Sequence, residues 1–311
     1  MPHDEGHAVA MRVGMAASAE FLGLDDSWPS LRSAMNDLGL EPEVRCWEDS
    51  DADWEHFALV VAMYTWGYVT LRHEFLAWTK RIEERTTLVN SAAHIQWSSD
   101  KRYLQDLSAK GVPVVPTSWA RPGEAWSPPA EDYVVKPCVA SGGLGAARYR
   151  DSSWDLAQAH VRRLHEAGHT VMVQPYQDSV DISGETAVVF IGDRISHAVQ
   201  KNALLVADVG EVERLWEREV ICPIEATSEQ RQVANAALAA AVDRFGPTAY
   251  ARVDLVEDHR GGAQVLEVEL IEPSLFLAAA EGSAGRLAEV LYGLAQQQAA
   301  GSTPRPAIPG N

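Results

Sequence analysis

The segment that decides the fold runs from Tyr133 to Arg150 and reads YVVKPCVASGGLGAARYR. An apolar strand ends at Lys136, a loop with almost no side chains follows at 141–145, and a second apolar strand begins at Ala146. Glycines let backbone N–H groups approach an anion closely, and a nearby lysine adds a positive charge. In a P-loop the lysine follows the glycines and a helix comes next, which is not the order here. Two interpretations stay open: an ordinary hairpin turn, and a loop that closes over phosphates.

The composition is that of a globular protein, with 46% hydrophobic and 23% charged residues among 311. The net charge of -18 argues against nucleic acid as a partner, because the phosphate backbone is also negative. No apolar run approaches the ~20 residues that span a bilayer, and Asp4 and Glu5 stand where a secretory signal needs positive charge. We therefore expect a cytoplasmic protein with no membrane partner. Three widely spaced cysteines argue against both a disulfide framework and a zinc site.

The first part of the chain alternates strands and helices, which predicts an α/β fold with a parallel, doubly wound sheet. Apolar strands are expected at 10–18, 43–47, 57–64 and 86–90, with helices at 28–38, 71–85 and 98–111. A linker rich in proline and glycine follows at 121–132. The remainder reads as an α+β arrangement with strands at 133–137, 146–150 and 170–176, hairpins at 185–201 and 249–273, and helices at 154–167, 228–245 and 283–299.

The hairpin at 249–273 carries a cluster of acidic residues. Strand alternation places Asp254 on the same face as Arg252, opposite Glu267 and Glu269, with Val265 expected in phase with the glutamates. Three carboxylates repel one another unless a cation compensates, and Mg²⁺ is commonly held by carboxylates together with phosphate oxygens. The alternative is an exposed hairpin face. Because the flanking residues are strongly apolar, we favour a metal site.

Two further features lie between the loop and this hairpin. The strand at 170–176 runs out into Gln174-Pro175-Tyr176, where exposed backbone can meet a purine ring. Glu185 and Lys201 follow on the next hairpin, and a lysine at the end of a strand can neutralise phosphate. The alternative for this pair is an ordinary cross-strand contact on the surface.

The order of these parts resembles the ATP-grasp superfamily of ATP-dependent carboxylate–amine ligases, over residues 98–277. The resemblance implies an ATP-grasp fold with an N-terminal Rossmann-like (pre-ATP-grasp) domain at 1–120. It also implies a lid subdomain with the glycine loop at 121–200, a C-terminal subdomain with the metal site at 201–300, and a disordered tail at 301–311.

The resemblance also assigns roles to individual residues. Those implied to bind ATP are Lys101, Lys136, Ser141, Gly142, Gly143, Gly145, Gln174, Pro175, Tyr176 and Glu185. The implied ligands of Mg²⁺, with Mn²⁺ as an alternative, are Asp254, Glu267 and Glu269; the implied catalytic residues are Lys201 and Arg252; and His197 and Glu272 are candidates for holding the substrate. Many relatives have Glu-x-Asn where this chain has Glu267-Val268-Glu269, and many carry an arginine at the position of Lys201.

The chemistry implied by the resemblance is attack of a substrate carboxylate on the γ-phosphate of ATP, followed by displacement of phosphate from the acyl phosphate by a nitrogen nucleophile. The ending LEVELIEPSLFL (266–277) is similar to small ligases of specialised metabolism, among them the cyclo-ligase that closes the D-cycloserine ring from O-ureido-D-serine. The expected partner is thus a small amino-acid-like substrate, with a second copy of the chain in a homodimer as a further expectation.

Two other functions stay open: a phosphotransferase on the same fold, and a nucleotide-binding protein without catalysis. A nicotinamide dehydrogenase is disfavoured, because no GxGxxG follows the first strand.

Overall fold

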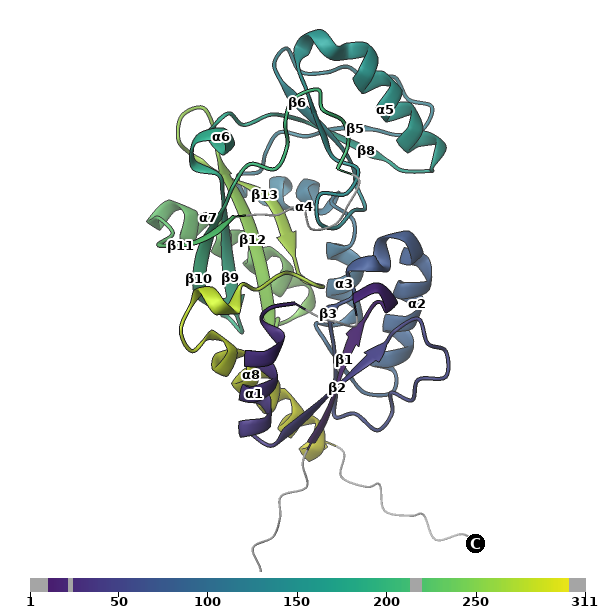
Figure 1. The fold of residues 1–311 in the computed structure, drawn as a ribbon, viewed down its shortest axis with the longest axis vertical. Helices are drawn as coiled ribbons and strands as arrows, with labels where there is room; N and C mark the ends of the chain where they lie inside the picture. The colour runs from purple at the N-terminus through teal and green to yellow at the C-terminus, as the bar shows by residue number, and fades with distance from the viewer. Residues whose placement is uncertain (1–10, 22–24, 213–219, 302–311) are drawn as a thin grey trace, which may run out of the picture.

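The structure, a computed structural model, contains three β-sheets among the residues that it describes, and one of them forms an end of the molecule (Figure 1). It describes residues 11–21, 25–212 and 220–301. The predicted disordered tail lies outside these ranges apart from Gly301. In the described part of the chain, no helix combines the length and apolar character that crossing a bilayer requires.

The N-terminal sheet has four parallel strands in the order β2-β1-β3-β4. Its strands are β1 (Met11–Ala17), β2 (Leu40–Cys46), β3 (Leu59–Tyr64) and β4 (Thr87–Val89). Side chains of β1 and β3 alternate between two hydrophobic cores, one shared with α1 (Trp28–Asp37) and the other with α2 (Arg72–Glu83). The predicted parallel, doubly wound layer is confirmed, and its Rossmann-like assignment stays a prediction.

The region around Lys101 differs from the single helix predicted over 98–111. Two short helices, α3 (Ala92–Ser98) and α4 (Tyr103–Ala109), flank a turn that contains Lys101. The Asp100 carboxylate accepts a hydrogen bond from the backbone N–H of Arg102 at 3.1 Å. Such a side-chain contact competes with helical hydrogen bonding and starts a new helix instead. Lys101 consequently projects from a turn.

The sheet at the end of the molecule is antiparallel, in the order β5-β8-β6-β7, and we call it the lid. Its strands are β5 (Ser118–Ala120), β6 (Tyr133–Pro137), β7 (Ala147–Tyr149) and β8 (Val171–Pro175), and α5 (Trp154–Glu166) covers one face (Figure 1). The buried residues between sheet and helix form a cluster that contains no residue of the other two sheets. The lid therefore has a core of its own.

The central sheet is antiparallel, in the order β11-β10-β9-β12-β13. Its strands are β9 (Glu185–Ile191), β10 (Arg194–Lys201), β11 (Ile221–Ile224), β12 (Tyr250–Glu257) and β13 (Ala263–Glu269). The short helix α6 (Ser179–Ser183) leads into β9. Pairing of β9 with β12 groups residues 185–201 with the C-terminal strands, so the predicted lid range of 121–200 spans two sheets. The predicted domain division stays a prediction.

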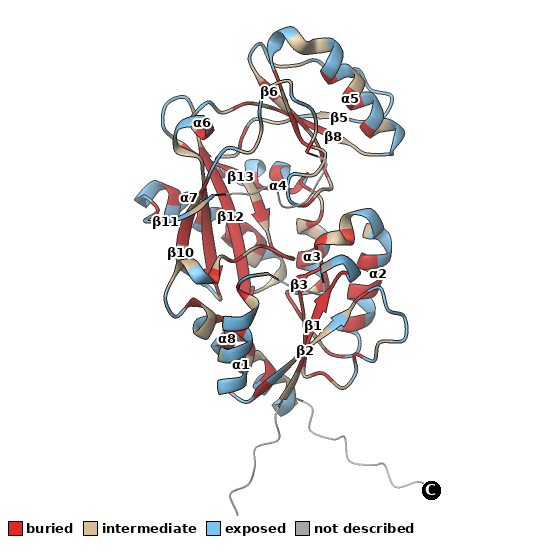
Figure 2. Ribbon diagram, viewed as in Figure 1, coloured by how far each residue is buried: buried red, intermediate tan, exposed pale blue. Residues whose placement is uncertain are grey.

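Helices cover both faces of the central sheet, whose strands are largely buried (Figure 2). Helix α7 (Ser228–Phe245) packs on one face, and α8 (Ser283–Gly301) packs on the other. The core around α8 also contains residues of β1, β3 and α1, so the N-terminal and central sheets share buried contacts. The short 3₁₀ helices are η1 (Ala19–Phe21), η2 (Trp66–Leu71), η3 (Asp151–Ser153) and η4 (Leu277–Ala279).

Candidate nucleotide and metal site

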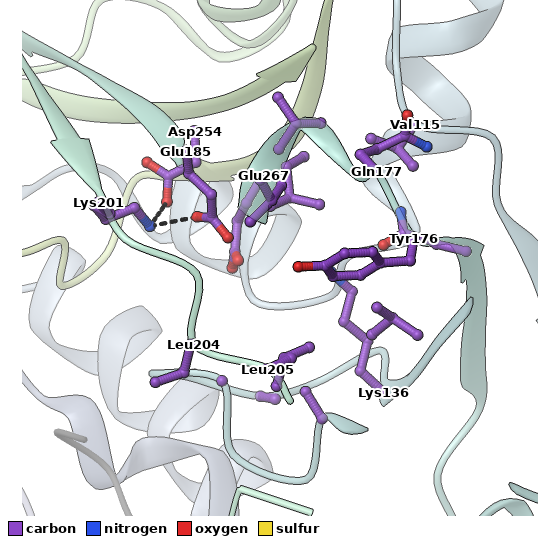
Figure 3. A pocket seen from close by; sticks show the side chains of 18 of the residues that line it. Val115, Lys136, Tyr176, Gln177, Glu185, Lys201, Leu204, Leu205, Asp254 and Glu267 are labelled. Carbon is purple, nitrogen blue, oxygen red and sulfur yellow. Dashed lines mark hydrogen bonds and ion pairs between the residues drawn. The ribbon is translucent and has the colours of Figure 1, made fainter. Parts of the chain in front are cut away.

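One cavity between the central sheet and the lid collects most of the residues that the sequence singled out (Figure 3). β12 and β13 contribute carboxylates and an arginine, β10 and the turn before α4 contribute lysines, and the lid contributes Lys136 and the glycine loop. The predicted site residues that line it are Lys101, Lys136, Gly142, Gly143, Gln174, Pro175, Tyr176, Glu185, Lys201, Arg252, Asp254, Glu267 and Glu269.

Pairing between β12 and β13 brings the three predicted metal ligands together. Asp254 stands opposite Glu267, and Arg252 stands opposite Glu269. The register shifts after Asp254, which is a β-bulge. The bulge reverses the phase beyond it, so Val265 is fully buried in the core beside α7 and Leu266 lines the cavity instead. The expectation that Val265 shares a face with the glutamates is wrong for this reason.

Asp254 is 2% exposed and is held by two cations. Arg252 donates to it from Nε at 2.8 Å and from Nη2 at 3.0 Å, and Lys201 donates from Nζ at 2.8 Å. Burial alone would raise the pKa of this carboxyl, but the two cations outweigh burial and lower the pKa to about 2. Lys201 Nζ also lies 2.8 Å from Glu185 and so joins β9, β10 and β12 (Figure 3).

The two glutamates of β13 are each paired with one cation. Lys101 Nζ lies 2.8 Å from Glu267 and donates to the carbonyl oxygen of Ala140 at 2.6 Å. Arg252 Nη2 lies 2.6 Å from Glu269. Burial raises the pKa of Glu269 to about 7, because the opposing attraction of Arg252 does not cancel it.

The carboxylate oxygens in this cavity are suitable ligands for a hard divalent cation, although they are not arranged in a complete coordination shell. Within the described ranges, no three His, Cys, Asp or Glu side chains converge to hold a metal ion. Both oxygens of Asp254 are engaged by cations, whereas Glu267 and Glu269 are each paired through Oε1 and are partly exposed in the cavity. Two carboxylates beside a phosphate site are the ligands that Mg²⁺ prefers. Glu267 and Glu269 are the carboxylates that could hold it, and the predicted ligand set of Asp254, Glu267 and Glu269 stays a prediction.

The glycine loop faces the cavity through Gly142 and Gly143. Both have positive φ, of 57° and 74°, which side-chain-bearing residues rarely adopt. The N–H of Gly145 instead donates to the carbonyl oxygen of Val212 at 3.0 Å, outside the cavity. This N–H holds the loop to the segment after Lys201, and the predicted contact of Gly145 with phosphate stays a prediction.

At the lid end of the cavity, Lys136 and the 174–176 segment share one wall. The structure records no hydrogen bond or ion pair for Lys136 among the described residues, and burial lowers its pKa. Gln174 donates from its side chain to Thr117 Oγ1 at 2.9 Å. The backbone N–H of Tyr176 donates to Asp132 O at 2.7 Å, so this N–H is already used within the protein, while Tyr176 lines the cavity.

The two predicted substrate residues differ in position. His197 lies outside the cavity: Nε2 is 2.9 Å from the carbonyl oxygen of Leu275, and Nδ1 is 3.0 Å from Ser196 Oγ. His197 is therefore not among the residues that line the cavity. Glu272 is buried beside the glycine loop, where burial raises its pKa to about 8 although a hydrogen bond from Ser141 opposes the rise. Roles for Glu272 and Ser141 in binding stay predictions.

The apolar lining of the cavity was missed by sequence reasoning. Side chains of this lining are Val115, Val134, Leu144, Val180, Leu204, Leu205, Val256 and Leu266. Period-two spacing could have found Val134 from Lys136 and Val256 from Asp254. Leu204 and Leu205 follow Lys201 without regular structure, and no periodic signal marks them.

Comparison with known proteins agrees with this geometry. The family described as the N-terminal domain of D-cycloserine synthetase DcsG matches residues 13–90. The cycloserine biosynthesis protein DcsG of Streptomyces lavendulae is 39% identical over 293 residues, which cover 90% of this chain and 97% of that protein. The crystal structure of D-cycloserine synthetase DcsG matches 91% of this chain and 99% of its own, with a TM-score of 0.85 and 37% identity.

A more distant likeness shows the fold alone. The D-alanine–D-alanine ligase of Bacillus anthracis complexed with ATP matches 94% of this chain and 99% of its own, with a TM-score of 0.64 and 14% identity.

Proposed function

We propose that this chain, which belongs to the DcsG family of ATP-grasp carboxylate–amine ligases, activates a substrate carboxylate as an acyl phosphate. The activated carbon then forms a bond with a nitrogen atom. The chain has the ATP-grasp fold and is an ATP-dependent ligase. The finer proposal is that the carboxylate and the nitrogen belong to one amino-acid-like molecule, as in the formation of D-cycloserine. Its biological setting is then antibiotic biosynthesis.

The observation that carries the proposal is the environment of Lys136. This lysine faces a cavity in which Lys101, Lys201 and Arg252 already have carboxylate partners, whereas no partner is recorded for Lys136 among the described residues. A partly buried cation is costly unless an anion compensates it. A nucleotide phosphate supplies that anion, and Val134 on the same face of β6 lies toward the apolar part of the cavity, where a base can bind.

Positioning and charge stabilisation are the main contributions of the protein to phosphoryl transfer. The N–H groups of Gly142 and Gly143 are placed to hold phosphate oxygens and to exclude water, which otherwise hydrolyses an acyl phosphate. Arg252 is fixed on one side by Asp254 and on the other by Glu269, and it donates to the carbonyl oxygen of Ser274 at 3.1 Å. Held in this way, its guanidinium places a fixed positive charge beside the reacting groups.

Magnesium, when bound by Glu267 and Glu269, would neutralise the phosphate oxygens and lower the barrier to their transfer. Lys201, bound to Glu185 and Asp254, is placed to stabilise charge on the transferring group. Glu272 suits the ammonium group of an amino-acid substrate, because a buried carboxylate favours a cationic partner.

Calorimetry of ATP binding with and without Mg²⁺ tests the nucleotide site. Wild-type protein is expected to bind ATP only with Mg²⁺, and Lys136→Ala and Glu269→Ala are each expected to weaken binding about tenfold or more, as loss of a charge-assisted contact does. Wild-type protein that ignores ATP under both conditions would contradict the proposal.

The products then separate the ligase from a phosphotransferase. With O-ureido-D-serine and a panel of amino acids, the ligase releases ADP together with a new amide, and hydroxylamine traps the acyl phosphate as a hydroxamate. Formation of ADP and a stable phosphorylated hydroxyl, with no amide, would show the phosphotransferase instead.

A further inference from the structure

Arg148, in the middle of β7, makes contacts that the proposed chemistry does not use. Its guanidinium carbon lies 3.5 Å from the centroid of the Tyr176 ring. The arginine side chain is 14% exposed, so the contact between cation and ring is largely shielded from water. Contacts of this kind are strongest when desolvated.

The Tyr176 ring is fixed at a second point by the same set of residues. Its hydroxyl donates to Oδ1 of Asp181 at 2.6 Å, while Arg148 Nη1 lies 2.8 Å from Oδ2 of the same carboxylate. Arg148 Nη2 lies 3.1 Å from Asp132, whose carbonyl oxygen accepts the N–H of Tyr176. The ring face, hydroxyl and backbone N–H of Tyr176 are therefore all held. Arg148 contacts the ring directly and pairs with both acidic residues that hold the other two groups.

One atom of Arg148 indicates that the stack itself has a role. Its Nε is buried and has no hydrogen-bond partner in the structure. A buried donor without an acceptor costs free energy, and a side chain that served only as an ion pair could turn to satisfy it. The guanidinium is instead oriented with its face toward the ring.

Tyr176 lines the apolar end of the cavity. It forms a small buried cluster with Val115, Val180 and Val256, against which Val134 and Leu266 pack. Glu267 and Glu269 line the same cavity and supply its charged part. A flat heteroaromatic ring suits an apolar slot with an aromatic wall, and the phosphates suit the charged part.

Arg148 also links this wall to the lid and to the segment after Lys201. It pairs with Val134 across the lid sheet, and its carbonyl oxygen accepts the N–H of Asp208 at 3.0 Å. Asp181, its partner, lies in α6, which leads into β9. One residue of the lid thus contacts the wall of the base-binding end and the helix that leads into the strand carrying Glu185.

We propose that Arg148 is a positioning residue for the nucleotide base: it presents the Tyr176 ring to the base and couples that wall to the lid. This inference rests on the proposed function, because it takes the cavity to bind ATP. It assigns to Arg148 a contribution to ATP affinity that depends on the base and not on the phosphates.

The test compares ATP with inorganic tripolyphosphate, which lacks the base, as Mg²⁺-dependent ligands of the full chain. Arg148→Met is expected to weaken ATP binding about tenfold and to leave tripolyphosphate binding within about twofold of wild type. In steady state the KM for ATP should rise with little change in kcat. Arg150→Met, which removes an exposed arginine paired with Asp208, is the matched control and should leave both ligands unaffected.

Arg148→Lys distinguishes stacking from charge. Lysine keeps the positive charge near Asp132 and Asp181 but lacks the planar fork, so it should restore thermal stability to a destabilised Arg148→Met protein without restoring ATP affinity. Full recovery of ATP affinity by lysine would overturn the inference, as would equal weakening of ATP and tripolyphosphate. If wild-type protein binds ATP and Arg148→Met binds it equally well, this inference alone fails; if wild-type protein binds no ATP, the proposed function fails with it.

Discussion

Asp254→Asn tests the charge network at the centre of the site through protein stability. The substitution keeps the size of the side chain and removes its negative charge. It leaves Arg252 and Lys201, which are 7% and 6% exposed, without their shared carboxylate partner. Each cation keeps another carboxylate partner: Glu269 for the arginine and Glu185 for the lysine. The cost should therefore lie below that of leaving a buried charge wholly uncompensated.

The structure sets the size of the effect. Lowering the pKa of Asp254 from 3.8 to about 2 corresponds to about 2 kcal/mol in favour of the charged form. Breaking a buried ion pair by removing one partner costs about 3–5 kcal/mol when the other is left alone. Since both cations keep a second carboxylate, we expect Asp254→Asn to lower the free energy of unfolding by about 2–3 kcal/mol.

Urea denaturation in buffer free of divalent cations measures this loss as a shift in the midpoint. Asp243→Asn is the matched control: Asp243 is exposed and lies 3.8 Å from Lys110, so its loss should cost less than about 0.5 kcal/mol. Adding Lys201→Met to Asp254→Asn removes one of the two cations, and the pair should show a coupling energy of about 1–3 kcal/mol. A stability within about 0.5 kcal/mol of wild type for Asp254→Asn, or strict additivity in the double variant, would refute the reasoning.

Two further predictions concern the backbone at Gly184 and the buried side chain of His94. Gly184→Ala should destabilise the protein by about 3 kcal/mol or more, because φ is +68° and a Cβ would overlap the carbonyl oxygen of Lys201. The control is Gly168→Ala, which should cost about 1 kcal/mol, because φ is +83° but the space around it is open. Thermal unfolding compares the two variants. Burial lowers the pKa of His94 below its ordinary 6.5, so the unfolded chain is protonated first and protein stability should fall as pH drops below about 6.5. The urea midpoint of His94→Gln should depend less on pH over this range than that of wild type. An equal dependence would contradict the assignment.

Strand periodicity was sufficient to place most of the charged site residues. Alternation along β12 put Arg252 and Asp254 on one face, and the same rule on β13 put Glu267 and Glu269 opposite them. Local patterns carry this information because a strand has a fixed period of two. The periodicity failed at Val265, where the bulge changes the phase and no residue type in the sequence marks it.

The remaining parts of the site depend on contacts between segments that are distant in sequence. Lys101 reaches Glu267 only because a turn separates α3 from α4, and Gly145 is held by Val212 from a segment without regular structure. No local pattern encodes either contact. His197 lies in the same strand as Lys201, but it is outside the cavity and contacts the carbonyl oxygen of Leu275. A residue close in sequence to the site is therefore not part of it.

The hydrophobic cores indicate which parts of the protein can move relative to one another. The N-terminal and central sheets share a buried cluster around α8, and the lid has a cluster of its own. The lid meets the central sheet through Met172, which belongs to the core beside α7, and through the small cluster around Tyr176. Few buried apolar contacts between two bodies allow one to move relative to the other. Lys136 and the glycine loop belong to the lid, and the carboxylates belong to the central sheet, so motion of the lid changes the distance between the phosphate-binding and metal-binding groups. Arg148 spans this junction, but the base-specific effect expected of its removal comes from its contact with the Tyr176 ring, which lines the apolar end of the cavity.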